Sequence, residues 1–468
     1  MKNKKKIIIA VAVVLAAALL TMGGVAGYRA YYNNTHVFIE DAVYEKDAQS
    51  ISLRGTGASI AHYEALREAL PECEVIWDLP FQGGYLSLDT TELTLTSLTE
   101  EEILLLDYLP GLKQVKAEGC RDYDALMALK EHRPDCEITY LVELEGAEYP
   151  QDVKELSFQD ADAVRLKEML VYLPAVQSVA IEAPTMPARE LLELVAAYPE
   201  IDFSWNATVL DTVYPSDTTA LDFSNVQLES VETLEAELAY LPALETVEVH
   251  NCGIDSETLS AWRERQAEHY KVVWTVKLSW GIELRTDAKT FMPVMMNEGT
   301  GRVWDQTLVE LKYCNELICV DVGHMPISHC DWAAYMPDLQ YLIVADTGIN
   351  SIEGLRGLQN LIYLESFTTP LTDYSPLLEC PNLKDLNMVN SKADPKVIAQ
   401  LTSLERLWWG DGGSYKVPLS KEEKQMIREA LPNTECQLGV LNPTSMGWRK
   451  GKLYYEMRDI LGMPYFGQ

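Results

Sequence analysis

The chain has few of the residues from which catalytic and metal sites are built. It holds nine cysteines and seven histidines in 468 residues, and no GxSxG, HExxH, Walker or strand-following GxGxxG sequence occurs in it. The cysteines are odd in number, include no CxxC pair and are too sparse for a disulfide scaffold, so most are expected to be small buried hydrophobic residues. No spacing singles out a pair of carboxylates for glycosidase chemistry. We therefore predict no cofactor and no enzymatic activity.

One cluster contains residue types that zinc uses. His324, His329 and Cys330 lie close together in the sequence, with two further cysteines shortly before them. The two histidines are five residues apart on an expected loop, and they match no paired-ligand motif. We predict ordinary loop or core residues here and no metal site.

Positive charge is also scarce. Lysine and arginine total 38 against 71 aspartate and glutamate residues, which gives a net charge of −33. A surface this acidic repels phosphate backbones, so nucleic acid is excluded as a natural partner. The charge fits a solvated exterior protein, or one that meets a cationic ligand.

The N-terminus predicts export from the cytoplasm. Residues 2–6 read KNKKK, and residues 7–27 carry no charge, a length sufficient to cross a bilayer as a helix. We predict a cytoplasmic basic tail (1–6), a single-pass transmembrane signal anchor (7–27) and a short stalk (28–40), with the bulk of the chain outside the cytoplasm. The alternative is a signal peptide cleaved near residues 25–27, which would give a secreted protein.

Internal repeats decide the fold. The tripeptide Tyr-Leu-Pro occurs at 108–110, 172–174 and 240–242, spaced by 64 and 68 residues, and 335–337 is a looser fourth copy. The unit that contains the second copy predicts strands at 154–158, 176–181 and 201–205. Between them, Leu166, Met169, Leu170 and Leu173 are spaced for one face of a helix. We predict divergent repeats over 41–285, in units of about 65 residues with three strand-plus-helix pieces each.

The C-terminal half is more regular. Leu317, Leu339, Leu361, Leu383 and Leu404 are 22, 22, 22 and 21 residues apart, and each begins a frame L-x-x-L-x-φ. This pattern resembles the leucine-rich-repeat family, in the short form of internalin-like bacterial surface proteins. The resemblance implies an α/β repeat: a horseshoe-like leucine-rich-repeat solenoid with parallel strands on its concave face and helices on its convex face. We predict an excursion at 286–312, regular 22-residue repeats at 313–415 and a C-terminal cap at 416–468, whose aromatic residues would cover the last repeat.

The family's asparagine after the strand is mostly missing. Asn251 and Asn390 fit that position, whereas Thr347 and Thr368 stand elsewhere. This departure leaves the tightness of the turn open, and it does not affect the solenoid.

Side chains at the x positions of the frame should face away from the core, because strand residues alternate between faces. They form two columns, one with Tyr341, Tyr363, Asp385 and Arg406, and one with Asp321, Ile343, Glu365, Asn387 and Trp408; Phe367 extends the surface. We predict a ligand-binding concave face formed by Tyr341, Tyr363, Glu365, Phe367, Asp385, Asn387, Arg406 and Trp408. The alternative is that these aromatic residues only stack along the ladder.

Together these features predict a membrane-anchored, extracytoplasmic leucine-rich-repeat protein that binds a protein, peptide or glycan at the cell surface and touches the membrane only through residues 7–27. Two alternatives stay open. One is a structural or regulatory ectodomain of a cell-envelope complex, acting through its acidic convex side. The other is a hydrolase with a site in the 286–312 excursion, using Asp305 or His324.

Overall fold

The computed structural model describes residue 29 and residues 32–296, 300–410 and 419–463. The predicted basic tail (1–6) and membrane anchor (7–27) lie outside the described residues, as does part of the predicted stalk. Within the described part of the chain, no helix is both long and apolar enough to span a bilayer. The chain divides into two compact units: unit 1, residues 1–205, and unit 2, residues 206–468.

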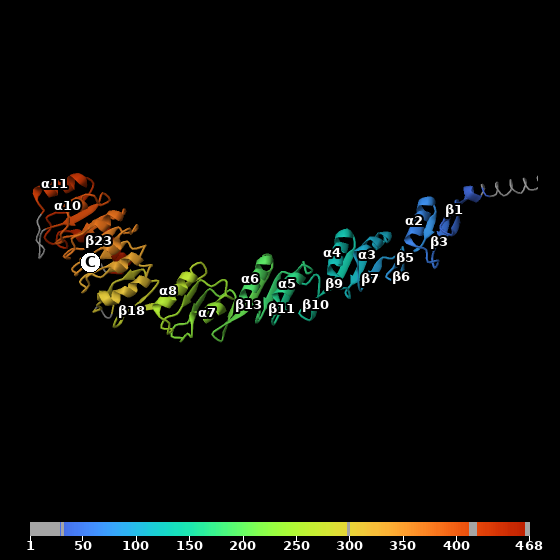
Figure 1. Cartoon of the computed structure of the whole chain (residues 1–468), viewed down its shortest axis with the longest axis horizontal. Coiled ribbons are helices and arrows are strands. Elements are labelled where there is room, and N and C mark those ends of the chain that lie inside the picture. Colours follow the sequence, from blue (N-terminus) through green and yellow to red (C-terminus); the bar gives the residue numbers. More distant parts are fainter. Residues whose placement is uncertain (1–28, 30–31, 297–299, 411–418, 464–468) are drawn as a thin grey trace, which may run out of the picture. The chain divides into compact units, whose positions relative to one another are not determined.

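Unit 1 is a series of small modules, in which parallel strands alternate with helices and an antiparallel hairpin follows (Figure 1). A leading hairpin consists of β1 (His36–Ile39) and β2 (Ala42–Glu45). The first module contains β3 (Ser50–Ser52), α2 (Ile60–Ala69), β4 (Glu74–Ile76), β5 (Asp78–Phe81) and β6 (Gly84–Ser87). The second contains β7 (Glu92–Thr94), α3 (Glu100–Leu105), β8 (Gln114–Ala117), α4 (Tyr123–His132), β9 (Glu137–Leu144) and β10 (Ala147–Pro150). The third contains β11 (Glu155–Phe158), α5 (Ala163–Leu170), β12 (Ser178–Ile181), α6 (Ala188–Ala197) and β13 (Asp202–Val209), and the boundary between the units falls inside β13.

Local sequence explains where these helices lie. The side chain of Asp162 accepts a hydrogen bond from the backbone N–H of Arg165, which caps α5. The residues predicted for its apolar face, Leu166, Met169 and Leu170, are all buried. Helix α3 starts with a complete capping box between Thr99 and Glu102.

The structure differs from the prediction in the third piece of each divergent unit. The third strand continues into a hairpin instead of a third helix. Strand β9 turns at Glu145 and Gly146, whose φ values are 50° and 75°. Two successive left-handed residues make the type I′ turn, which matches the twist of paired strands. Each small sheet therefore ends in its own hairpin, and the divergent repeats form separate sheets instead of one continuous ladder.

The tyrosine of the repeated tripeptide joins successive modules of unit 1. The Tyr172 hydroxyl donates to Asp124 Oδ1 at 2.7 Å, and Asp124 lies on α4 of the preceding module. Tyr108 makes the corresponding bond to Glu64 on α2. This bond raises the pKa of Tyr108 to about 12, because the hydroxyl must keep its proton to donate.

Unit 2 begins with one more module of the same kind. It follows β14 (Thr212–Pro215), the second strand of the hairpin with β13. The module contains β15 (Ala220–Asp222), α7 (Val231–Leu238), β16 (Thr246–Glu248), α8 (Ser256–Arg265), β17 (Lys271–Val273), β18 (Thr275–Ser279) and β19 (Ile282–Arg285). Here Tyr313 takes the joining role and donates to Glu257 on α8 at 2.6 Å. The predicted fourth copy of the tripeptide is not used in this way, since Tyr335 is exposed.

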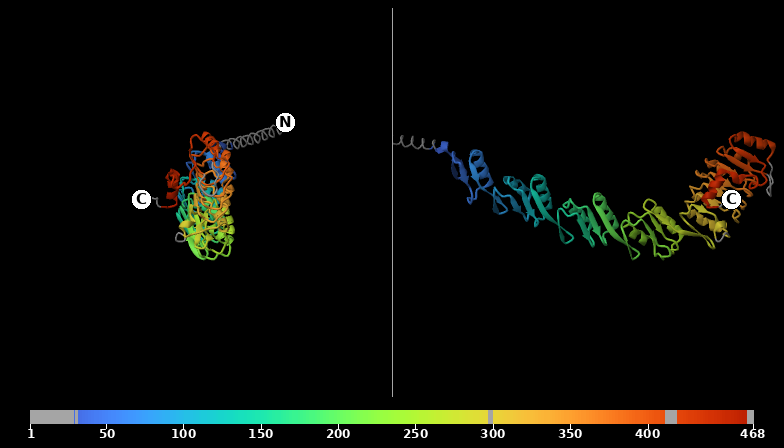
Figure 2. Two further views of the ribbon diagram at one scale, coloured as in Figure 1. Left: turned by 90° about the vertical axis from the view of Figure 1, so that its left-hand side faces the viewer. Right: turned by 180° about the vertical axis from the view of Figure 1, so that it is seen from behind.

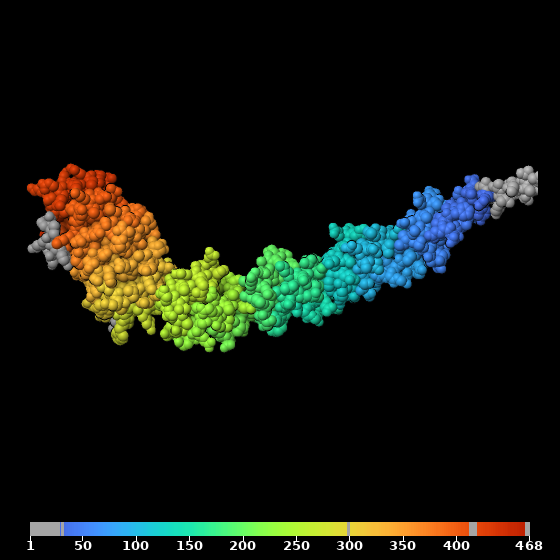
Figure 3. Space-filling view, in the orientation of Figure 1, coloured from blue at the N-terminus to red at the C-terminus, as the bar shows by residue number. Residues whose placement is uncertain are grey.

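The remainder of unit 2 is one parallel sheet of seven strands in sequence order. The strands are β20 (Thr290–Phe291), β21 (Cys319–Asp321), β22 (Tyr341–Ile343), β23 (Tyr363–Glu365), β24 (Asp385–Asn387), β25 (Arg406–Trp409) and β26 (Glu435–Leu438). The chain returns through η5 (Asp331–Tyr335), η6 (Glu353–Leu355), η7 (Ser375–Glu379), α10 (Pro395–Ile398) and α11 (Lys421–Ala430). Leu342, Leu364, Leu386 and Leu407 lie opposite one another in adjacent strands, as the spacing predicted. Their stacking builds a continuous core, and these repeats pack as one body (Figure 3).

The family's asparagine position, the ninth of the frame that begins at Leu339, Leu361 and Leu383, holds hydroxyl residues that close the turns; Asn390, predicted to fit that position, comes one residue before it. The Thr347 hydroxyl donates to the Val344 carbonyl at 2.6 Å. One repeat later the Thr369 hydroxyl donates to the Ser366 carbonyl at 2.8 Å, and the Ser391 hydroxyl donates to the same carbonyl at 3.0 Å. These three hydroxyls satisfy buried backbone groups, so the turns are tight without an asparagine ladder.

The predicted excursion starts too early. Thr290 and Phe291 lie inside the predicted range 286–312, yet they form the first strand of the sheet and pair with β21. Phe291 lies opposite Val320 and is 1% exposed, so it belongs to the core. The segment that departs from the repeat comes after β20 and contains η2 (Pro293–Met295), α9 (Asp305–Leu308) and η4 (Val309–Tyr313).

The cysteines behave mainly as hydrophobic residues. All nine are free, and seven are buried, whereas Cys73 and Cys436 are half-buried. Burial raises the pKa of the Cys314 and Cys330 thiols to about 12, so both stay protonated at neutral pH.

Candidate functional site

The eight residues predicted to bind a ligand do lie together on one face of the seven-stranded sheet. Seven belong to β22, β23, β24 and β25, and Phe367 follows β23. Their apolar members form a cluster separate from the leucine core. We call this surface, the side of β21–β25 opposite the core, the sheet face.

The sheet face is covered, whereas the sequence predicted an open surface. Six of the eight residues are at most 3% exposed, namely Tyr341, Tyr363, Glu365, Asp385, Asn387 and Trp408. Phe367 and Arg406 are half-buried. A partner cannot reach these side chains without movement of whatever lies on them.

The cover is the chain's own C-terminal segment, defined here as residues 447–463. It contains η8 (Trp448–Lys450) and α12 (Lys452–Ile460). Trp448, Tyr454 and Met457 from this segment cluster with Cys319 on β21 and Trp408 on β25, among others. The left view of Figure 2 shows the red C-terminal helix against one side of the repeats. The segment thus crosses the sheet, whereas the sequence predicted a cap on the last repeat only.

Trp448 is the centre of this contact. Its indole N–H lies 2.8 Å from Glu365 Oε1 and 3.0 Å from the Tyr363 hydroxyl oxygen. The Tyr363 hydroxyl also donates to Glu365. Trp448 is 1% exposed, and its ring centroid lies 5.6 Å from that of Tyr363 and 5.8 Å from that of Trp408. The face therefore holds the tryptophan by an aromatic pocket with a carboxylate at its base.

Arg406 fixes the backbone of the segment. Its guanidinium donates to Asp385 Oδ2 at 2.9 Å and to the Trp448 carbonyl at 2.9 Å. The guanidinium carbon also lies 4.4 Å from the Trp448 ring centroid. A Cβ atom placed on Gly451 would lie 1.7 Å from Arg406 Nη1, so any larger residue would displace the guanidinium or the segment. The Tyr341 hydroxyl makes a further polar contact with the segment and donates to Glu456 Oε2 at 3.2 Å.

The covered carboxylates resist ionisation. Burial raises the pKa of Asp385 to about 6, although Arg406 acts in the opposite direction. Burial also raises the pKa of Glu365 and of Asp321, and Arg449 lowers both. Taking these charges out of water costs free energy that their partners offset only in part.

A cavity of about 190 Å³ remains between the C-terminal segment and the sheet face. Asp321, Glu365 and Phe367 line it from the sheet side, and Arg449, Tyr454 and Arg458 line it from the segment. The residues of the segment were not among those predicted for the site. A signal existed, since residues 447–460 hold four basic and two acidic residues in a chain whose net charge is −33.

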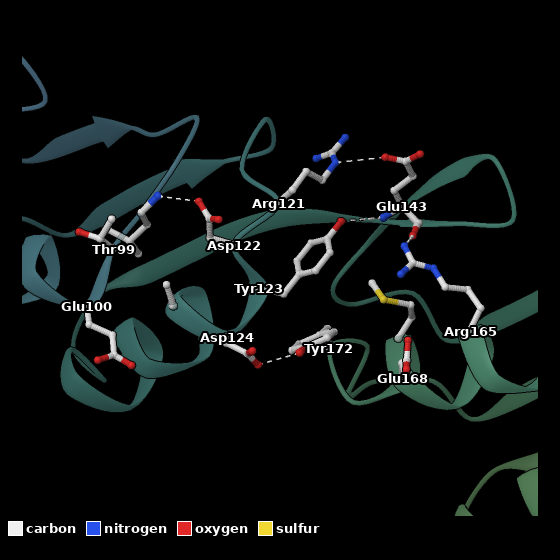
Figure 4. Close-up of a pocket in the computed structure, with 13 residues that line it drawn as sticks. Thr99, Glu100, Arg121, Asp122, Tyr123, Asp124, Glu143, Arg165, Glu168 and Tyr172 are labelled. Carbon is white, nitrogen blue, oxygen red and sulfur yellow. Dashed lines mark hydrogen bonds and ion pairs between the residues drawn. The ribbon is translucent and has the colours of Figure 1, made fainter.

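Unit 1 has a larger groove, with a volume of about 810 Å³ (Figure 4). Its polar groups bond mainly to one another: Tyr172 to Asp124, Arg121 to Glu143, and the backbone N–H of Glu143 to the Tyr123 hydroxyl. The bond from Tyr172 to Asp124, and one from Arg165 to the Glu143 carbonyl, link α4 and β9 to the next module, so the groove is a junction between modules.

The residues of the hydrolase and zinc alternatives are engaged elsewhere. Asp305 accepts hydrogen bonds from the backbone N–H and the hydroxyl of Ser328, and His329 Nδ1 lies 3.3 Å away. Nucleophilic catalysis would need a histidine that bridges the serine and the aspartate. Here Ser328 and His329 each contact the Asp305 carboxylate directly. His324 pairs with Asp346 at 2.8 Å, and the described residues contain no group of three or more metal-ligating side chains.

No family model matches this chain, and neither does any curated protein sequence. Solved structures do match. An internalin of Listeria monocytogenes is 13% identical, with 82% of this chain and 91% of that chain covered and a TM-score of 0.26. A leucine-rich-repeat protein of Leptospira interrogans is 15% identical, with 73% and 92% covered and a TM-score of 0.29. The 22-residue period, the parallel ladder of leucines and the turn after each strand define a leucine-rich-repeat fold, as the sequence predicted.

Proposed function

We propose that the protein is a recognition protein outside the cytoplasm, anchored in the membrane through residues 7–27, which binds a protein or peptide on its sheet face. The observation that carries this proposal is the chemistry of the face. Four aromatic side chains, three carboxylates and one arginine gather there, and they already hold a peptide segment, the chain's own. Aromatic residues and arginine are the usual anchors of protein interfaces.

The proposed activity is binding without catalysis. The polar groups of the face are bonded in pairs that orient a tryptophan and a backbone carbonyl. Such contacts select a peptide by its side chains and by its main chain. The sequence-based suggestion of a glycan ligand has less support, because the face is occupied by apolar and aromatic contacts over most of its length.

Site-specific photo-crosslinking in intact cells tests the binding surface. A photoreactive phenylalanine analogue would replace Phe367, on the rim of the cavity, and Tyr335, an exposed aromatic residue on the helical side, would serve as the matched control. We expect a crosslink to a second protein from position 367 and none from 335. Crosslinks from 335 alone would reject the sheet face as the recognition surface.

The location is tested on the same cells. We expect protease added outside intact cells to digest residues 32–463, and the protein to stay with membranes after a high-salt wash. Release of full-length soluble protein would indicate a cleaved signal peptide. Protection from the protease in intact cells, lost on lysis, would place the repeats in the cytoplasm and refute the proposal.

A further inference from the structure

We infer that the C-terminal segment occupies the recognition surface as an internal competitor, and that the partner is a peptide with a tryptophan followed by basic residues that replaces it. This inference rests on the proposed function and names the partner of that same surface. The segment itself supplies the model of the ligand, since it reads Trp448-Arg449-Lys450 where it enters the face.

Charge and shape complementarity support the choice of ligand. The sheet face presents Asp321, Glu365 and Asp385, and Arg449 of the segment lies close enough to lower the pKa of the first two. The indole of Trp448 fills the aromatic pocket and donates to Glu365, while its carbonyl accepts from Arg406. A peptide with the same tryptophan, carbonyl and basic neighbour would make the same contacts.

The internal occupant leaves part of the face unsatisfied. Trp408 Nε1 and Asn387 Nδ2 are buried, and neither has a hydrogen-bond partner among the described residues. The cavity beside Asp321 and Glu365 adds unfilled space. A buried donor without an acceptor costs free energy, so a partner that brings acceptors to these two N–H groups would bind better than the segment does.

The segment is joined to the sheet in a way that permits replacement. Between the end of β26 and Trp448, the backbone passes through Gly439 and Gly447, whose φ values are 123° and 101°. Residues 441, 442 and 444–446 are exposed, whereas Val440 and Pro443 are buried. The segment can therefore leave the face while the ladder of leucines, which it does not touch, stays intact.

The experiment uses the full chain and a fluorescein-labelled synthetic peptide of residues 445–462. The variant Gly451→Ala places a methyl group against Arg406 and weakens the internal segment, while the probe keeps its glycine. The control Lys452→Ala changes the next residue, whose side chain is 86% exposed. The probe competes with the chain's own segment, so its apparent affinity is reduced to the fraction of molecules whose face is open. We therefore expect the probe to bind Gly451→Ala at least roughly fivefold more tightly than wild type or the control.

A probe with Trp448→Ala should lose binding to the Gly451→Ala chain. Equal binding of both probes would overturn the inferred ligand class. Faster amide exchange of residues 447–460 in Gly451→Ala would show that the face is open. If the probe still does not bind to this variant, the inference is overturned as well. If the variant instead forms dimers that exchange C-terminal segments and do not bind the probe, the partner is a second copy of the chain and the inferred peptide partner is rejected. The crosslink from position 367 is independent, so a captured partner without probe binding leaves the proposed function standing and rejects only this inference.

Discussion

The substitution Gly451→Ala probes how firmly the C-terminal segment is docked. Residue 451 has ordinary backbone geometry, with φ of −71°, so alanine adds no backbone strain. The added Cβ atom would instead lie 1.7 Å from Nη1 of Arg406 and 2.6 Å from its Cζ. Either the guanidinium or the segment must move.

The size of the effect can be worked out for each of these two movements. If the guanidinium leaves, its bonds to Asp385 and to the Trp448 carbonyl are lost, and charge-assisted bonds contribute about 1.5–3 kcal/mol each. If the segment moves, overpacking costs about 1–3 kcal/mol. The molecule takes the cheaper route, so docking is weaker by about 1–3 kcal/mol, which raises the undocked population roughly 5- to 150-fold.

The effect depends on pH if Arg406 leaves Asp385. Without its cation, the buried carboxyl has a pKa even further above its ordinary value. At pH 5 the carboxyl is mostly protonated and loses little. At pH 8 it must either stay charged without a partner or take up a proton, and both cost free energy. The loss of docking is therefore larger at pH 8.

Hydrogen–deuterium exchange of residues 447–460 measures docking directly. We expect faster exchange in Gly451→Ala, more so at pH 8 after correction for the intrinsic rate, and wild-type exchange in Lys452→Ala. Exchange of the alanine variant within threefold of wild type at both pH values would refute the reasoning.

Three further predictions concern the same two units. Tyr172→Phe removes the bond to Asp124 between modules and should lower the free energy of unfolding of unit 1 by about 1 kcal/mol, seen as faster exchange in α4; unchanged exchange would rule out a joining role. The buried guanidinium of Arg133 donates to two backbone carbonyls, and Arg133→Met removes this donor, so urea unfolding should show a loss of about 2–4 kcal/mol in stability. The control Arg121→Met, at the surface, should lose less than about 1 kcal/mol, and equal losses would contradict the prediction. Burial raises the pKa of Asp385 from 3.8 to about 6, so the stability that this group contributes is present below about pH 4 and is lost as the pH rises through 6. The free energy of unfolding, measured in urea at a series of pH values, should therefore fall across this range in wild type and not in Asp385→Asn. The same fall in the variant would assign the effect to another group.

The regular repeats could be predicted because one residue type recurs at a fixed interval. Leu342 and Leu364 are 22 residues apart, and each must face the same core, so spacing alone gives the register. The hairpins of the divergent modules were missed because a third helix was assumed by analogy with the first two. The dipeptide Glu145-Gly146 between two apolar strands was the available signal, since glycine tolerates the left-handed conformation of the turn.

The site could be predicted only in part. Alternation along a strand says that Tyr363 and Trp408 face away from the leucine core, and they do. It does not say what lies on that face, because a contact such as Trp448 to Glu365 spans 83 residues of sequence. Local patterns contain no information on such a pairing, although the excess of positive charge near Trp448 was compatible with it.

The hairpins that close each small sheet have a mechanical consequence. A ladder shared by all repeats transmits a pulling force along its whole length, whereas the sheet of β7–β10 ends at its own hairpin. A chain tethered at one end and held at the other would then yield one module at a time. Residues 92–150, once unfolded, extend to roughly 200 Å. Unit 1 would thus lengthen in separate steps and absorb work at each, as an elastic linker does.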